Sequence, residues 1–174
     1  MLRSLHAIAA AIGLCAPTLP DAVAESYAET IQREAVEHEI DPLLVVAVVT
    51  NESRWHASAD DGRGCIGLGQ VCLVGFEACR ADRHGGECAA VRTRLFDPHQ
   101  NLAATAALLG ANRDYCRRRF REGSARYWLQ GYQGFRGRVC GRVKRGGKWR
   151  RVAVPRLTRR VLGTRAMLER RVGR

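Results

Sequence analysis

The chain has 174 residues and a formal net charge of +12, carried mostly by arginine. This length predicts one domain, or one domain with an appendage. The positive charge indicates an anionic partner, although plain surface solubility also explains most of the arginines. The chain contains no recognised nucleic-acid-binding motif, which argues against DNA or RNA as that partner.

The first 24 residues have the three parts of a secretory signal peptide. Arg3 lies in a basic end, residues 7–16 form an apolar core, and Ala22-Val23-Ala24 is an A-x-A cleavage site. A membrane anchor is the alternative, but this apolar stretch is too short to span a bilayer. We therefore expect residues 1–24 to be removed on export, which leaves a domain at residues 25–174.

A buried helix is the most informative element that follows. An amphipathic helix is predicted at residues 27–40, and an apolar run then extends from Asp41 to Ser53. Asp41 is a suitable helix cap, and Pro42 fits the first turn. A helix this apolar belongs in the core. It carries Glu52 to the edge of a cleft, where lost hydration raises the pKa of the carboxyl toward that of a general acid.

The elements up to residue 130 are predicted to be loops and helices. A loop rich in Ala, Ser, Asp and Gly is expected at 55–64, a short helix beginning near Leu68 within 67–79, and a polar loop at 81–88. Asp97 is the expected cap of a helix at 98–109. Further helices are expected at 112–121, where the sequence is strongly basic, and at 124–130.

A β-hairpin is predicted near the C-terminus, as an insertion at about residues 141–155. Residues 143–152 contain Gly146-Gly147 between two short runs of strand-forming residues, and they carry five basic residues and Trp149. A helix with an apolar stripe follows at residues 156–172. The sequence thus predicts a mainly α domain with a small β-hairpin insertion.

Six cysteines remain after the expected cleavage, because Cys15 lies in the signal peptide. An even number in an exported protein indicates disulfides, although the spacing does not give the connectivity. A zinc site is disfavoured, since there is no Cys-x-x-Cys pair and no suitably placed His. The six are Cys65, Cys72, Cys79, Cys88, Cys116 and Cys140.

Four motifs together resemble the catalytic domain of soluble lytic transglycosylases, relatives of goose-type lysozyme. Glu52-Ser53 is similar to the family's Glu-Ser pair at the end of a buried helix, and Gly67-Leu68-Gly69-Gln70 to its Gly-Leu-Met-Gln motif. Asp97 to Leu102 resembles Asp-Pro-x-x-Asn-Ile. Tyr132 to Val139 resembles Tyr-Asn-Ala-Gly-Pro-Gly-x-Val. The resemblance extends from about residue 27 to 167 and implies a lysozyme-like α-helical fold.

Three departures from the family pattern concern the shape of the cleft. Gly69 replaces the usual Met, Gln133 replaces the usual Asn, and Thr105 stands where Gly is common. We expect Gly69 to remove one wall of the cleft and to loosen its loop.

The resemblance implies that Glu52 is the catalytic acid and that no cofactor or metal is needed. Glycoside cleavage usually uses two carboxylates. Asp97 already has a role as a helix cap, whereas Asp60 and Asp61 lie on a loop after Glu52, where aspartates are usually solvated turn formers. A lone acid fits the family reaction, in which the sugar's own C6 hydroxyl attacks C1 and gives a 1,6-anhydro product.

Three further residues are candidate substrate-binding residues. Ser53 either binds substrate or caps the helix. Gln70 either holds a sugar amide or the acid, or is a surface residue. Tyr132 either contacts Glu52 or the sugar, or packs in the core.

The resemblance implies peptidoglycan glycan strands as the substrate and a periplasmic location. The small size and the cysteines resemble specialised members that open the wall for a secretion, pilus or conjugation apparatus. Two alternatives remain open: a water-using lysozyme on the same fold, in which Asp60 or Asp61 takes part, and a non-catalytic assembly factor. A weak contact with an anionic wall polymer or membrane surface is also expected.

Overall fold

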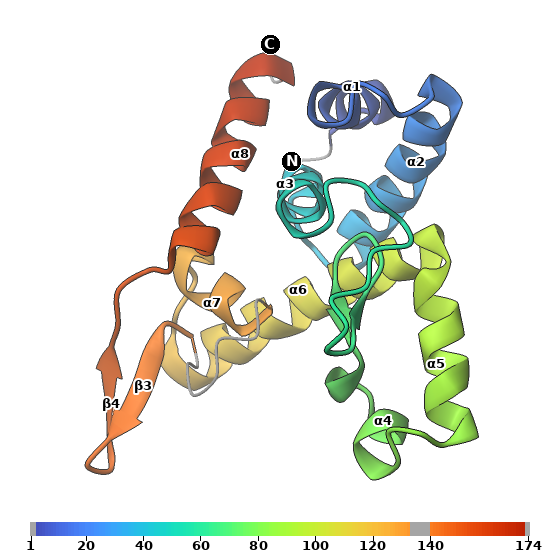
Figure 1. The fold of residues 1–174 in the computed structure, drawn as a ribbon. Helices are drawn as coiled ribbons and strands as arrows, with labels where there is room; N and C mark the ends of the chain where they lie inside the picture. The colour runs from blue at the N-terminus through green and yellow to red at the C-terminus, as the bar shows by residue number, and fades with distance from the viewer. Residues whose placement is uncertain (1–2, 133–139, 173–174) are drawn as a thin grey trace.

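One buried helix, α3 (Pro42–Glu52), lies at the centre of the fold. The structure is a computed structural model that describes residues 3–132 and 140–172. Figure 1 shows α3 nearly end-on, between α2 (Asp21–Glu37) and α8 (Arg156–Val172). Residues 43–49 are each no more than 3% exposed. The Leu43 amide donates to the Asp41 side chain (3.0 Å), so the predicted cap and buried helix are confirmed.

The helix before α3 begins earlier than the sequence predicts. α2 starts at Asp21 rather than Tyr27, because its buried stripe already includes Ala24, and it ends at Glu37. Before it lies α1 (Leu5–Cys15), whose Ile8, Ala11 and Ile12 are fully buried against the main core. In this structure, the region predicted to be a signal peptide thus forms α1 and the first turn of α2. Within the described ranges, no helix has both the length and the apolar character needed to cross a bilayer.

The segment after α3 forms a second, smaller core, and one element predicted there is wrong. β1 (Cys65–Ile66) pairs antiparallel with β2 (Val71–Cys72), and the 3-10 helix η1 (Leu73–Gly75) follows. The helix predicted from Leu68 is wrong, since Gly67 (φ +72°) and Gln70 (φ +52°) turn the chain back on itself. The helical residues here lie later, in α4 (Glu77–Ala81) and α5 (Gly86–Phe96), and α5 shortens the loop predicted at 81–88.

The C-terminal half follows the prediction closely. The two helices expected at 98–109 and 112–121 are one helix, α6 (Pro98–Phe120), which Asp97 caps by accepting from the Gln100 amide (2.8 Å). α7 (Ala125–Tyr132) follows. β3 (Arg142–Arg145) and β4 (Lys148–Arg151) form the predicted hairpin (Figure 1). The fold is therefore mainly α with two small antiparallel hairpins.

All six cysteines expected in the mature chain form disulfides. The pairs are Cys65–Cys72, Cys79–Cys88 and Cys116–Cys140, and Cys15 is free. The first two pairs close short loops in the segment between α3 and α6. The third joins α6 to the residue just before the β3–β4 hairpin.

Candidate active site

Glu52 is the last residue of α3, and it lies half-buried where the central helix leaves the core. Tyr132, the last residue of α7, is close enough for the two groups to interact electrostatically. Burial raises the pKa of the Tyr132 phenol well above its usual range, a hydrogen bond with Thr105 lowers it, and the charge of Glu52 raises it further. The phenol therefore stays neutral next to the carboxyl. The fold thus brings together two of the predicted site residues from different helices.

The Tyr132 hydroxyl is held by the glycine-rich turn and by α6. It donates to the Gly69 carbonyl oxygen (2.5 Å) and lies 3.3 Å from the Thr105 hydroxyl. Because a phenol has one proton, which the shorter contact uses, the Thr105 hydroxyl is left to donate to the phenolic oxygen. The ring of Tyr132 is thereby fixed relative to residues 67–70.

Asn101 on α6 also holds this turn, and it is not among the predicted site residues. Its side-chain amide donates to the carbonyl oxygens of Ile66 and Leu95 (2.8 Å each), and its oxygen accepts from the Gly69 amide (2.7 Å). Asn101 is fully buried, and a buried side-chain amide is expected to find such partners. Its place as the Asn of the motif at Asp97 to Leu102 was the available sequence signal.

The expectation for Gly69 is wrong. Gly69 is buried, and a Cβ atom there would lie 1.9 Å from the Thr105 Oγ1 atom and 2.7 Å from the Tyr132 hydroxyl. The missing side chain therefore leaves no gap, because Thr105 fills the space. The turn is not loosened either, since the amide and the carbonyl of Gly69 are both hydrogen-bonded.

Ser53 and Gln70 have structural partners in this structure. The Ser53 hydroxyl is buried, accepts from the Trp55 amide (3.1 Å) and donates to the Val49 carbonyl (3.4 Å). The Gln70 side-chain amide donates to the carbonyls of Ala59 (3.2 Å) and Gly67 (3.1 Å). Both side chains thus hold the loops around Glu52. Their predicted contact with substrate stays a prediction.

The loop aspartates considered as a second catalytic carboxylate have structural roles as well. Asp60 pairs with Arg92 and accepts from the Gly62 amide (2.9 Å). Asp61 accepts from the amides of Arg63 (2.7 Å) and Cys65 (2.9 Å). Burial raises the pKa of the Asp61 carboxyl, but backbone N–H groups outweigh that effect, so the pKa is below its usual value. The Asp61 carboxylate therefore stabilises a turn of this loop.

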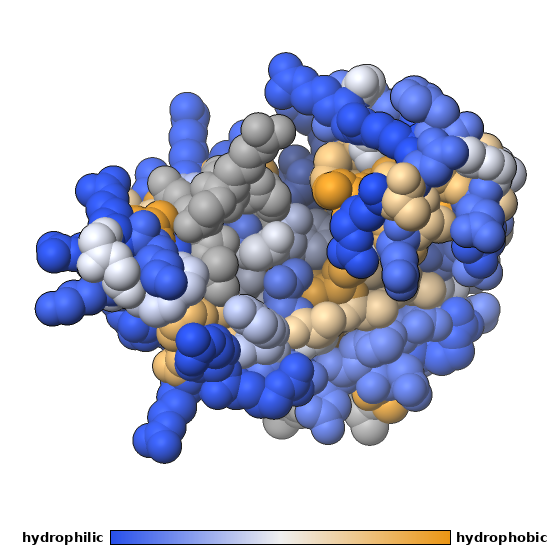
Figure 2. Space-filling model, turned by 90° about the horizontal axis from the view of Figure 1, so that it is seen from below, coloured by the Kyte–Doolittle hydropathy of each residue, from blue (hydrophilic) through white to orange (hydrophobic). Residues whose placement is uncertain are grey.

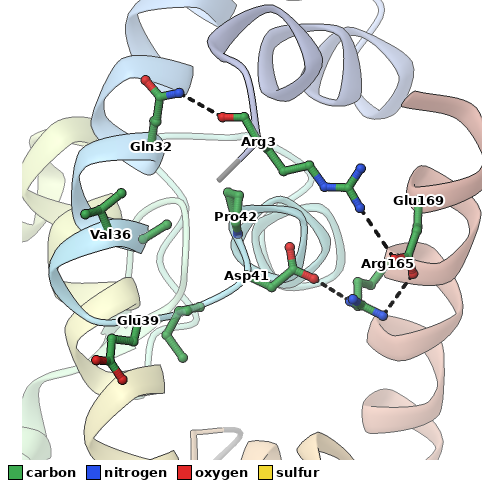
Figure 3. Close-up of a pocket in the computed structure, with 10 residues that line it drawn as sticks. Arg3, Gln32, Val36, Glu39, Asp41, Pro42, Arg165 and Glu169 are labelled. Atoms are coloured by element: carbon green, nitrogen blue, oxygen red, sulfur yellow. Dashed lines mark hydrogen bonds and ion pairs between the residues drawn. The ribbon is translucent and has the colours of Figure 1, made fainter. Parts of the chain in front are cut away.

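A separate cavity of about 520 Å³ lies at the other end of α3 (Figure 3). Four of its charged side chains pair with one another: Arg165 contacts Asp41 (2.6 Å) and Glu169 (3.1 Å), and Arg3 contacts Glu169 (3.4 Å). α3 has 11 residues, so the cavity lies about 16 Å along the helix from Glu52. It is therefore distinct from the candidate active site.

Comparison with known proteins gives one family. A family model described as Transglycosylase SLT domain matches residues 29–138. The match includes Glu52, the turn at 67–70, Asn101 and Tyr132. Residues 133–139, which complete the Tyr132 motif and include Gln133, lie outside the described residues. No curated protein and no solved structure matches the chain.

Proposed function

The chain belongs to the transglycosylase SLT family, and from that membership we propose that it is a peptidoglycan lytic transglycosylase with Glu52 as its general acid. One observation carries the assignment of the acid. Glu52 ends a buried helix beside the neutral phenol of Tyr132, while Asp60 and Asp61 are engaged in loop contacts.

The proposed reaction cleaves the β-1,4 bond between MurNAc and GlcNAc without water. The Glu52 carboxyl protonates the glycosidic oxygen, and the C1–O bond breaks. The resulting carboxylate then takes the proton of the C6 hydroxyl as that oxygen attacks C1, which restores the acid and closes a 1,6-anhydro ring. The substrate's N-acetyl group is suited to stabilise the positive charge at C1. The Tyr132 phenol stays protonated throughout because its pKa is raised, so it does not compete with the Glu52 carboxylate as the base.

Replacing the acid by its amide tests this assignment. Glu52→Gln keeps the shape of the side chain but removes its proton, so lysis of purified sacculi should fall by about 10²–10⁴-fold, the usual contribution of general acid–base catalysis. Glu29→Gln is the matched control, because Glu29 is exposed on α2. Lysis by a folded Glu52→Gln protein at the wild-type rate would remove Glu52 from the mechanism.

The products separate the proposal from its hydrolytic alternative. Mass spectrometry of released muropeptides should show ends lighter by one water than reducing ends. If only reducing ends appear, the protein is a lysozyme-type hydrolase, and Asp60→Asn and Asp61→Asn become the next variants. If no product appears from folded protein, the result favours the alternative that the protein is a non-catalytic assembly factor.

We further propose that the enzyme acts in the periplasm after removal of residues 1–24. Its three disulfides support an oxidising compartment. Local opening of the wall for a secretion, pilus or conjugation apparatus is the proposed role. Deletion of the gene should then impair assembly of one such apparatus, and a Glu52→Gln copy should fail to restore it.

A further inference from the structure

The β3–β4 hairpin is attached firmly to the helical core. The Cys116–Cys140 disulfide joins α6 to the base of the hairpin. The Val152 amide donates to the Gly141 carbonyl (2.9 Å), which closes that base. Trp149 packs edge-on against Phe120, with ring centroids 5.3 Å apart. At the other end, Gly146 (φ +53°) and Gly147 (φ +75°) form a two-residue turn of the kind that matches strand twist. The hairpin is therefore a rigid extension of the helical core (Figure 1).

Two of its four cross-strand pairs place like charges opposite each other, which destabilises a hairpin. These pairs are Arg142 with Arg151 and Arg145 with Lys148. The first pair shares an internal anion. Glu122 is only 7% exposed, and its carboxylate lies 2.7 Å from Arg151 and 4.0 Å from Arg142. The protein thus offsets the repulsion within this inner pair, Arg142 and Arg151, with a buried carboxylate that lies near both guanidinium groups.

The outer pair, Arg145 and Lys148, has no such anion. Side chains alternate between the faces of a strand, so Arg145 and Lys148 lie on the face opposite Arg142 and Arg151, together with Arg150. All three cations are exposed. In the described parts of the chain, no carboxylate pairs with any of them. Figure 2 shows hydrophilic side chains that project at the left of the molecule, the side on which the hairpin lies in Figure 1.

We propose that Arg145, Lys148 and Arg150 form a binding surface for the carboxylates of the peptide stems on peptidoglycan. The inner pair shows that the hairpin accommodates a carboxylate between opposed cations, and the outer pair presents the same arrangement to the outside. The choice of polymer rests on the proposed function.

The position of the hairpin favours the polymer that occupies the cleft. The Arg151 guanidinium lies 4.4 Å from the centre of the Tyr127 ring. Tyr127 lies on α7, five residues before Tyr132, whose phenol is beside Glu52. Five residues of helix span about 7.5 Å. The inner face of the hairpin thus lies on the side of Glu52. A glycan strand bound at Glu52 brings its stems to the outer face only if it extends past the hairpin, whereas a short soluble fragment does not need that surface.

Binding to sacculi tests the proposal, with Glu52→Gln present in every protein so that the polymer stays intact. The test variant is Arg145→Gln/Lys148→Gln/Arg150→Gln. The matched control is Arg160→Gln/Arg170→Gln/Arg171→Gln, which removes three exposed arginines from α8 and changes the net charge equally. Co-sedimentation should show about tenfold weaker binding for the test variant alone, as expected for three exposed ion pairs, and less salt dependence.

Chemical blocking of the polymer identifies the ligand. Sacculi whose carboxyl groups have been converted to neutral amides should bind the parent protein no better than the test variant. Unchanged binding to amidated sacculi, or an equal loss in the control variant, would overturn the proposal. So would a test variant that loses binding only to vesicles of anionic phospholipid. Thermal melting checks folding, and because the substitutions relieve like-charge repulsion, the melting temperature should not fall.

Lysis assays on proteins with Glu52 intact keep this proposal separate from the proposed function. If the wild type lyses no wall, the enzymatic proposal fails while the binding result still decides the role of the hairpin. If the wild type is active, the test variant should cleave short soluble glycans at the wild-type rate.

Discussion

A single methyl group at residue 69 should disturb the candidate active site. A Cβ atom on Gly69 would lie 1.9 Å from Thr105 Oγ1 and 3.1 Å from Thr105 Cβ. Thr105 is fully buried on α6, and a change of its rotamer would leave the new Cβ atom 2.7 Å from the Tyr132 hydroxyl, so the backbone of the turn must move. That movement pulls the Gly69 carbonyl away from the Tyr132 hydroxyl, which now lies 2.5 Å from it.

The expected loss combines two effects. Overpacking a core costs about 1–3 kcal/mol, and the weakened hydrogen bond about 0.5–1.5 kcal/mol. Gly69→Ala should therefore lower the free energy of unfolding by about 2–4 kcal/mol, which for a protein of this size lowers the melting temperature by about 5–15 °C. Urea denaturation monitored by circular dichroism measures the change, and lysis of sacculi should fall in parallel.

Removing the opposing side chain should recover part of this loss. Thr105→Gly eliminates the two shortest contacts with residue 105, at a cost of about 1 kcal/mol for glycine within a helix. In that background, Gly69→Ala should cost at least 1 kcal/mol less than it does in the wild type. Simple additivity of the two substitutions would refute the steric explanation.

A second cycle asks whether Thr105 acts through Tyr132. Thr105→Val keeps the branched shape without the hydroxyl, and it should lower kcat about three- to tenfold, the value of one hydrogen bond. In a Tyr132→Phe background the same substitution should leave kcat unchanged. A further loss there would mean that Thr105 contributes by packing alone.

Three other predictions concern stability. A chain that starts at Glu25 should fold and lyse sacculi if residues 1–24 are a leader; failure to fold, while the full chain folds, would make α1 part of the mature domain. Cys116→Ser/Cys140→Ser should lower the free energy of unfolding by about 3.5 kcal/mol, against about 2.4 kcal/mol for the shorter Cys65–Cys72 loop; equal losses would contradict the loop-entropy explanation. The pKa of Asp61 is lowered on folding, so its carboxylate stabilises the protein above the unfolded pKa of about 4 and ceases to do so as pH falls through the folded value. Asp61→Asn should thus be less stable than the wild type at neutral pH, and denaturation curves should converge in acid.

The sequence predicted those elements whose signals are local. The cap at Asp41, the Pro in the first turn and the apolar run specify α3 without help from the rest of the chain. Gly146-Gly147 likewise specifies a two-residue turn, and the hairpin has the expected position. In both cases the residues that determine the structure lie within a few positions of one another.

The glycine-rich turn was misread because its conformation depends on distant residues. Residues 65–72 form a pair of short strands instead of a helix, held by the buried amide of Asn101 from a helix about 30 residues later. The seven-residue spacing of Cys65 and Cys72, which on a helix places them on one face, instead sets them opposite each other across the strands. The glycines of this segment argue locally against a continuous helix, but the pairing of the two strands depends on contacts with α6.

The departures at Gly69 and Thr105 have a common explanation in α6. Asp97, Asn101 and Thr105 follow one another at intervals of four, so they lie along one face of that helix. Asp97 caps the helix, Asn101 fixes the backbone of the turn, and Thr105 occupies the space beside Gly69. The two departures therefore compensate each other sterically, and the position of Tyr132 beside Glu52 depends on a helix face that need not contact the substrate at all. Substitutions along this face should change the rate of cleavage by moving the turn and Tyr132, even though Glu52 and its helix remain unchanged.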